Sequence, residues 1–265
     1  MDSFDQVLQG LMQAVQVSRA RQDGVAVGEY RCECGQIRRW DDPNRCAICP
    51  PRSPDALSAE EKRVLLQPAF RTIPDGMDWC RIGNPKWEEH CARKGKELVK
   101  SWRREAGSTV LWGRTGAGKT IAAVALMHRI LDHVLRNDVD RQMLRFAAGM
   151  RFVSALDLAL DRRKHPLGKA EAPLVELAKK ASLLVLDEVG YEVFEPGRDT
   201  TLFEIANDRF GKSQKPTIMT TGLDFRRDGR PVEGWDRFVS RYGEALWRRF
   251  RECGVEIELQ KAGAK

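Results

Sequence analysis

A glycine-rich stretch in the middle of the chain carries residue types suited to binding a polyphosphate. Its glycines let successive backbone N–H groups curve around the anion, because no Cβ blocks the approach. The lysine near its end would reach the β- and γ-phosphates, and the next threonine hydroxyl would ligate Mg²⁺. The stretch reads Gly113, Arg114, Thr115, Gly116, Ala117, Gly118, Lys119 and Thr120. This G-x-x-x-x-G-K-T spacing predicts a nucleoside triphosphate site.

The segments on either side of this stretch strengthen the prediction. An apolar run at 109–112 comes before it and is typical of a strand, and residues 121–135 form a helical pattern after it. The helix would point its N-terminus, the positive end of its dipole, at the same anion. Strand, turn and helix in this order are the structural context that a phosphate-binding loop requires.

A pair of acidic residues supplies the second half of the predicted site. Asp187 and Glu188 follow a continuous apolar run at 182–186, which is typical of a strand buried on both faces. Asp187 would hold Mg²⁺ opposite Thr120, and Glu188 would deprotonate a water for attack on the γ-phosphate. A kinase would need an acceptor pocket, which nothing in the sequence indicates. We therefore predict ATP hydrolysis, with Lys119 and Glu188 among the catalytic residues.

Further strand candidates alternate with helical stretches and define the fold class. They lie at 151–154, 217–221 and 255–259, and Ser154 is placed to cap the helix that follows it. Such alternation predicts an α/β fold with a parallel sheet between helices. The strand at 217–221 ends in Thr220 and Thr221, where a polar residue could sense the γ-phosphate. A threonine pair at a strand end is also common for capping alone.

Two helices are expected between the N-terminal region and the phosphate loop. The first begins with a capping box at 58–61 and is expected to stop before Pro68. The second is expected to run from 85 to 105, with its basic residues on a solvated face. The proline-rich stretch 50–54 reads as a stiff linker.

The N-terminal region carries four cysteines and an amphipathic helix pattern. Residues 3–21 place apolar side chains at helical spacing, so this helix would either fold back on its own chain or dock in a partner's groove. The cysteines form two close pairs that suit a tetrahedral Zn²⁺ site, with four unliganded thiols as the alternative. They are Cys32, Cys34, Cys46 and Cys49. Nucleic acid and protein are equally plausible ligands of such a module.

Composition limits the class of protein. The chain has 265 residues, a formal net charge of +7, seven cysteines and a pI near 9.1. The basic excess is compatible with nucleic acid or an acidic protein surface as partner. No apolar run approaches the ~20 residues of a membrane span, and no signal peptide is evident. We expect no membrane partner, a cytoplasmic location and no disulfide framework.

A basic segment lies just before the last predicted strand. Arg248 and Arg249 fall there, and an arginine at such a helix end can complete a neighbouring subunit's site in trans. Arginines in a basic segment are more often exposed surface residues. Spacing alone does not decide between an arginine that acts in trans and an arginine that is only exposed at the surface.

Taken with the motifs above, the chain resembles AAA+ ATPases of the DnaC-type helicase-loader and IstB-type transposition-helper group. The resemblance rests on 113–120, 183–190, 202–210 and 215–221, and it covers roughly residues 100–260. It implies a five-stranded AAA+ core without a lid domain, ATP-dependent self-association and binding of single-stranded DNA. It also implies delivery of a hexameric replicative helicase to that DNA, with Arg249 as the residue acting in trans and Arg248 as the near alternative.

The resemblance also implies roles for the N-terminal region and for the threonines before Gly222. Loaders of this group grip the helicase with an N-terminal region that in some members carries zinc, which suits the four cysteines. The group usually has Asn where Gly222 stands, so the sensor role would fall to Thr220 or Thr221. We expect three parts: 1–54, a helix and four-cysteine zinc module that binds the helicase; 55–100, a linker with helices; and 101–265, the ATPase domain.

The preferred reading is thus an ATP-dependent loader of a replicative helicase, with Zn²⁺, ATP and Mg²⁺ bound. One alternative is an IstB-type ATPase helper of a DNA transposase, which would use the same ATPase residues. Another is a DNA-binding adaptor in which the nucleotide is structural and hydrolysis is negligible.

Overall fold

The computed structural model describes residues 29–31, 37–39, 57–104, 107–137, 139–165, 171–191, 201–212, 214–223, 238–239, 241–252 and 254–260. The chain divides into two compact units, Met1–Ser58 and Ala59–Lys265. In the first unit, β1 (Glu29–Arg31) pairs with β2 (Ile37–Arg39) in an antiparallel hairpin. The helix predicted at 3–21 and the four candidate zinc ligands Cys32, Cys34, Cys46 and Cys49 lie outside the described residues.

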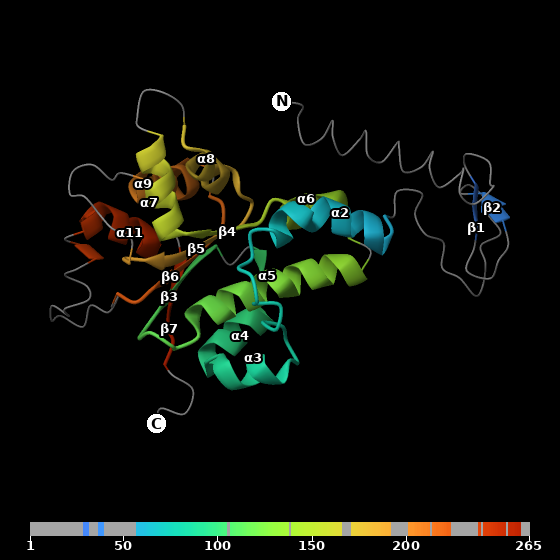
Figure 1. Ribbon diagram of the computed structural model, residues 1–265, viewed down its shortest axis with the longest axis horizontal. Helices are drawn as coiled ribbons and strands as arrows, with labels where there is room; N and C mark the ends of the chain where they lie inside the picture. Colours follow the sequence, from blue (N-terminus) through green and yellow to red (C-terminus); the bar gives the residue numbers. More distant parts are fainter. Residues whose placement is uncertain are drawn as a thin grey trace. The chain divides into compact units, whose positions relative to one another are not determined.

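The second unit is built on a five-stranded parallel sheet, as the sequence predicts (Figure 1). Its strands are β3 (Ser108–Trp112), β4 (Arg151–Ser154), β5 (Leu184–Val189), β6 (Thr217–Thr221) and β7 (Gly254–Glu258). They lie in the order β4-β5-β6-β3-β7, and each neighbouring pair is parallel. Because the carboxyl ends of parallel strands share one edge, the ends of β3, β5 and β6 meet there.

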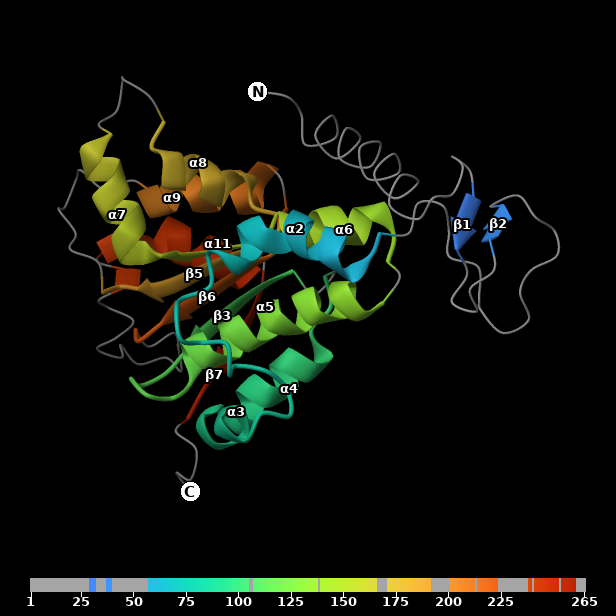
Figure 2. The same cartoon turned by 45° about the vertical axis from the view of Figure 1, so that its right-hand side comes forward.

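Helices cover both faces of this sheet (Figure 2). On one face lies α5 (Lys119–Arg136), with α2 (Ala59–Phe70), α4 (Arg93–Ser101) and α6 (Arg141–Ala148) packed against it. On the other lie α7 (Ala155–Lys164), α8 (Pro173–Lys180), α9 (Thr201–Ala206) and α11 (Glu244–Glu252). In the part of the chain that the structure describes, none of the helices combines the length and apolar character of a membrane span.

Strand alternation divides the sheet's side chains between the two faces. One set joins the core under α7, α8, α9 and α11, and its members from the central strands are Val110, Trp112, Leu184, Leu186 and Met219. The intervening residues Leu111, Val185 and Ile218 are equally buried. A strand that buries both faces reads as a continuous apolar run, which is why β5 was recognisable in the sequence.

A fully buried arginine ties the helices α8 and α9 to the sheet. Arg209 lies in the π-helical segment Asn207–Lys212 that continues α9. Its guanidinium donates to the Thr217 hydroxyl at 2.7 Å and to the carbonyls of Ala178, Ala181 and Pro216 at 2.9, 2.7 and 2.6 Å. Burial lowers the pKa of this guanidinium to about 10. Two of these bonds hold the start of β6 and the other two hold the end of α8, so Arg209 has a structural role.

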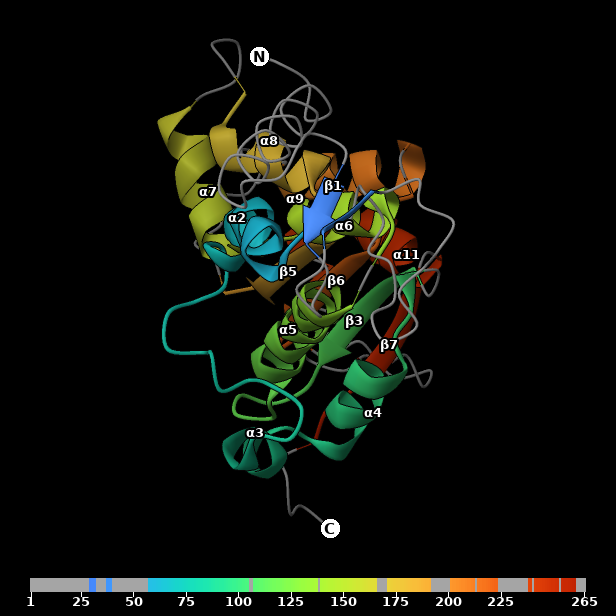
Figure 3. The same cartoon turned by 90° about the vertical axis from the view of Figure 1, so that its right-hand side faces the viewer.

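Two of the helix predictions are wrong in their bounds. The helix α2 continues through Pro68 to Phe70, since the missing N–H near the helix end removes a single backbone bond. The helix expected at 85–105 is two helices, α3 (Pro85–His90) and α4, separated at Cys91 and Ala92 and ending at Ser101 (Figure 3). Both residues at this break have extended backbone angles.

Candidate nucleotide-binding and hydrolysis site

The phosphate loop connects β3 to α5, where two of its glycines touch backbone of other segments. Gly113 has φ +138°, and a Cβ there would lie 2.2 Å from the carbonyl oxygen of Leu259. Gly118 has φ +82°, and a Cβ there would lie 2.7 Å from the carbonyl oxygen of His90. Only glycine fits at either place. The second contact also shows why the helix at 85–105 is interrupted, because the chain at the break lies against the loop.

The remaining loop residues present a backbone concavity to solvent. Arg114, Thr115 and Gly116 are exposed at the tip, whereas Ala117 is buried beneath them. The Lys119 ammonium donates to the carbonyls of Gly113 and Arg114 at 2.7 and 3.0 Å, so it lies across the loop. Burial lowers the pKa of Lys119, while Asp187 and Glu188 act to raise it. A polyphosphate in the loop would stabilise the protonated form of this lysine.

The predicted metal ligands lie in direct contact. The Thr120 hydroxyl is 3.0 and 3.2 Å from the two carboxylate oxygens of Asp187, which is buried at the end of β5. Burial raises the pKa of Asp187, although hydrogen bonds from Thr220 and Thr120 act against this. A hydroxyl and a buried carboxylate form the all-oxygen set that Mg²⁺ prefers, and its charge would offset the burial of Asp187. The residues present therefore fit the ion.

The two candidate sensor threonines point to different partners. The Thr220 hydroxyl donates to Asp187 Oδ1 at 2.5 Å and accepts the backbone N–H of Glu188 at 3.0 Å. The Thr221 hydroxyl instead donates to the Val189 carbonyl at 2.6 Å and accepts the N–H of Leu223. Of the pair, Thr220 is thus the one that contacts the acidic residues, although both are buried.

The proposed base, Glu188, has an unusual backbone. Its φ of +59° is one of two positive values at non-glycine positions in the described chain. The register between β5 and β6 shifts between Leu186 and Val189, so the strand bulges at this residue. The Glu188 side chain is exposed, whereas the neighbouring Asp187 is buried. Such strain persists where surrounding structure enforces it, here the Thr220 hydroxyl holding the Glu188 N–H.

Comparison with known proteins identifies the family. The family model described as IstB-like ATP binding protein matches residues 89–234, which is more than half of the chain. The chain belongs to the IstB-like ATP-binding protein family. The predicted resemblance to the DnaC/IstB group of AAA+ ATPases is thereby confirmed, and the family supports ATP as the nucleotide ligand.

Several solved structures resemble this IstB-like chain in fold. The crystal structure of the DnaC helicase loader is 21% identical with a TM-score of 0.46, covering 63% of this chain and 86% of that one. The crystal structure of DnaI is 18% identical with a TM-score of 0.44, covering 75% and 94%. AMPPCP-bound DnaA from Aquifex aeolicus is 18% identical with a TM-score of 0.44, covering 63% and 44%. No match was found among curated proteins.

A cavity of about 600 Å³ adjoins the acidic end of the IstB-like site and was not anticipated from the sequence. Thr120, Asp187 and Glu188 line one side of it, and residues of β4 and α7 line another. Thr72, Pro74 and Met77, from the stretch after α2, and Leu174 of α8 also line it. The Thr72 hydroxyl also accepts the backbone N–H of Phe152 in β4 at 3.0 Å. The segment between α2 and α3, which carries no motif, therefore forms part of the site.

The glycine at 222 has a steric reason in this structure. A Cβ at that position would lie 2.0 Å from the Tyr191 hydroxyl oxygen and 2.8 Å from its ring. Tyr191 follows β5 directly, and its backbone N–H donates to the Glu188 carbonyl. A larger residue at 222 would displace this ring.

The structure does not bring Arg249 to the nucleotide loop of its own chain. Arg249 lies on α11, where it donates to the side-chain oxygen of Asn207 and packs over the ring of Phe203 at 5.4 Å. Its neighbour Arg248 is exposed and lies 3.6 Å from Glu244 of the same helix. Arg249 is thus half-buried on α11, on the face of the sheet that α9 also covers, away from Lys119.

Two further cysteines lie among the described residues of the second unit. Cys80 and Cys91 are both buried as free thiols. Burial raises the pKa of Cys80 to about 11 and that of Cys91 to about 12. Both remain neutral at physiological pH, which suits packing rather than reactivity.

Proposed function

We propose that this chain hydrolyses ATP and uses the cycle to deliver a hexameric replicative helicase to single-stranded DNA during replication initiation. The hydrolysis step rests on one observation above all. The Thr120 hydroxyl, the buried Asp187 carboxylate and the Thr220 hydroxyl form one hydrogen-bonded cluster, with Glu188 beside it. The cluster lies at the carboxyl ends of β5 and β6, on the edge of the sheet where the phosphate loop follows β3. The γ-phosphate of a bound nucleotide would lie at this edge.

Each residue would contribute a distinct part of the reaction. Lys119 would exchange its two loop carbonyls for phosphate oxygens, and the exposed loop N–H groups would hold the rest of the triphosphate. Thr120 and Asp187 would hold Mg²⁺, whose charge stabilises the negative charge on the phosphates. Glu188 would orient a water and accept its proton as it attacks. In an assembly, Arg249 of a neighbouring copy would approach the γ-phosphate and stabilise developing charge.

Two substitutions test the hydrolysis assignment. Lys119→Ala should abolish binding of a fluorescent ATP analogue, because the loop loses its phosphate-contacting cation. Glu188→Gln should bind the analogue normally yet release phosphate about 100- to 10,000-fold more slowly, the range expected on removing a general base. Glu97→Gln, an exposed position on α4, is the matched control and should leave both properties unchanged. Normal turnover by Glu188→Gln would contradict the mechanism.

The motifs at 113–120, 183–190, 202–210 and 215–221 support the DnaC/IstB group as a whole, and the N-terminal helix pattern and cysteines favour the loader role within it. We infer that residues 1–54 hold Zn²⁺ through Cys32, Cys34, Cys46 and Cys49 and form the helicase grip. The test is co-elution with the host's hexameric replicative helicase, first with ATP and then with ADP. A complex that disappears on deletion of residues 1–50 is the expected result.

A second function is favoured by the family match itself. The matching model describes IstB-like ATP-binding proteins, so an ATPase that assists a DNA transposase would use the same residues. Absence of a helicase complex in either nucleotide would overturn the loader role in favour of this one. Negligible hydrolysis, with or without single-stranded DNA, would instead favour a DNA-binding adaptor with structural nucleotide.

A further inference from the structure

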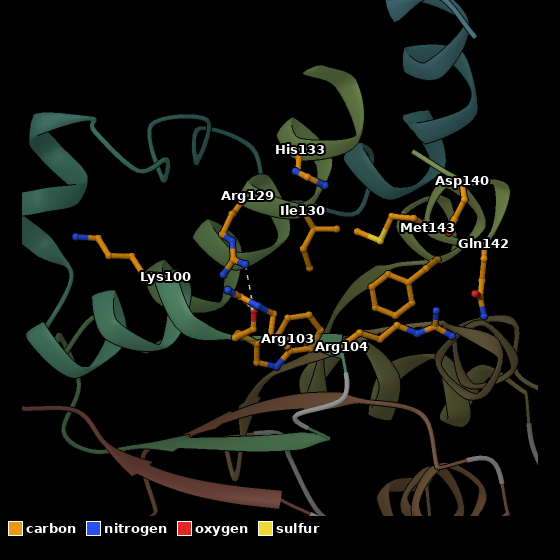
Figure 4. Close-up of a pocket in the computed structure, with 11 residues that line it drawn as sticks. Lys100, Arg103, Arg104, Arg129, Ile130, His133, Asp140, Gln142 and Met143 are labelled. Carbon is orange, nitrogen blue, oxygen red and sulfur yellow. Dashed lines mark hydrogen bonds between the residues drawn. The ribbon is translucent and has the colours of Figure 1, made fainter. Parts of the chain in front are cut away.

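A second cavity lies on α5 away from the nucleotide site and is bordered by basic side chains. Its volume is about 640 Å³, and eleven residues line it (Figure 4). Arg129 stands ten residues after Lys119, so the cavity begins about 15 Å along the helix axis from the phosphate loop. No step of ATP binding or hydrolysis described above uses any residue of this cavity.

The charge of this basic cavity is strongly one-sided. Lys100, Arg103, Arg104 and Arg129 contribute four cations, and Asp140 is the single acidic residue among the described residues of the lining. Asp140 is already engaged, because its carboxylate accepts the N–H of Met143 at 2.6 Å and caps α6. Among the described residues, no carboxylate forms an ion pair with any of the four cations. Within the part of the chain that the structure describes, the four positive charges of the cavity are therefore not balanced by ion pairs.

Hydrogen bonds and packing fix the arginines without neutralising them. Arg129 donates to the backbone carbonyls of Val99 and Trp102, and Arg103 donates to those of Ser101 and Trp102. Burial and then the nearby Arg103 guanidinium lower the pKa of Arg129. Two guanidiniums held this close by backbone carbonyls repel each other, and an anion between them would relieve that repulsion.

The floor of the basic cavity is apolar and partly aromatic. Trp102, Ile130 and Phe146 are buried beneath it. The Arg104 guanidinium lies 5.1 Å from the centre of the Phe146 ring, so it extends across the floor toward α6. In Figure 4, Lys100 lies at one end of the cavity and Gln142 at the other, with the arginines between them. Both end residues are exposed, so a bound chain could continue past each end.

From these features we propose that the basic cavity is where this protein contacts the backbone of single-stranded DNA. Guanidiniums without a described carboxylate partner match phosphates, and the exposed, flat Arg104 guanidinium, supported by Phe146, can stack on unstacked bases of any sequence. A duplex would leave that stacking surface unused, because its bases are stacked inside. The inference rests on the single-stranded DNA binding of the proposed function and assigns its surface.

The test is the affinity for a fluorescein-labelled oligothymidylate across a series of salt concentrations, with ATP present. Arg103→Ala/Arg104→Ala removes two phosphate contacts, which should lower the slope of log affinity against log salt by about 1.4. At 0.1 M salt the same change weakens binding roughly 25-fold. Arg63→Ala/Lys94→Ala removes two exposed cations from α2 and α4 outside the cavity and should leave the slope nearly unchanged.

The variant Lys100→Ala/Arg103→Ala also removes two cations from the cavity but keeps the contact between Arg104 and Phe146. It therefore tests the inference even if the loss of that contact impairs folding of the first variant. Each variant should retain the wild-type affinity for the ATP analogue. Wild-type affinity and slope in both cavity variants would overturn the inference while leaving the proposed function standing. Wild-type protein that fails to bind the oligonucleotide would contradict both. Variants that keep DNA binding but lose the helicase complex would show the cavity to be a docking site for an acidic protein surface, which also overturns the inference.

Discussion

Replacing Thr220 by valine should slow ATP hydrolysis about 10- to 150-fold while leaving ATP binding nearly unchanged. The hydroxyl donates to the Asp187 carboxylate at 2.5 Å and accepts the N–H of Glu188, so it orients both acidic residues. A hydrogen bond to a charged group contributes about 1.5–3 kcal/mol. We take this whole contribution to be lost from the transition state. Each 1.36 kcal/mol lost there slows the reaction tenfold, which gives the expected range of about 10- to 150-fold.

The adjacent residue provides a matched control. Thr221→Val is the same chemical change, one residue further along the same strand, at an equally buried position. Its hydroxyl bonds to the Val189 carbonyl and the Leu223 N–H, so its loss should reduce stability by about 1 kcal/mol. For a unit of this size that lowers Tm by about 2–4 °C. Turnover should stay within about twofold of wild type, since no acidic residue loses a contact.

Both variants would be measured by steady-state phosphate release, by titration with a fluorescent ATP analogue, and by thermal unfolding. The expected pattern is slow turnover by Thr220→Val and nearly wild-type turnover by Thr221→Val, with both variants somewhat less stable than wild type. Turnover of Thr220→Val above half of the wild-type rate would refute the role given to this hydroxyl. A larger loss in Thr221→Val than in Thr220→Val would refute the assignment between the two residues.

Three other expectations can be checked directly. Arg249→Ala and Glu188→Gln should each be inactive alone, yet a mixture should regain phosphate release, because a Glu188→Gln copy can supply its arginine to an Arg249→Ala copy; no recovery would contradict action in trans. Arg209→Met removes four hydrogen bonds of a buried guanidinium and should cost about 3–5 kcal/mol, lowering Tm by about 6–20 °C in a melting experiment. Purified protein should carry one equivalent of zinc by metal analysis, and Cys46→Ser/Cys49→Ser should lose both that zinc and the helicase complex.

The phosphate loop and the sheet could be predicted because their signals are local. The pattern at 113–120 needs only its flanking strand and helix to be meaningful, and the structure has both in place. The placement of Asp187 beside Thr120 also followed, since parallel strands bring their carboxyl ends to one edge. These contacts depend on topology, which the strand and helix alternation already specified.

The features that the sequence did not reveal depend on contacts between distant segments. The interruption of the helix at Cys91 and Ala92 arises where the chain meets the backbone at Gly118, a contact no local pattern encodes. The choice between Thr220 and Thr221 depends on strand register. Period-2 alternation places them on opposite faces, but only the pairing of β6 with β5 decides which hydroxyl reaches Asp187.

The electrostatics of the catalytic cavity support our proposal that hydrolysis needs a second copy of the chain. Of the described residues that line it, Asp157, Asp161, Asp187 and Glu188 are acidic, and Lys164 is the single cation. Bound ATP would add further negative charge at the same place, and Lys119 and one Mg²⁺ would face all of it. A cation delivered from outside would favour the transition state, in which charge spreads over the γ-phosphate oxygens. Arg249 of the same chain is not among the described residues that line this cavity, so the arginine that completes a site would come from a neighbour's α11, after leaving its contacts with Asn207 and Phe203.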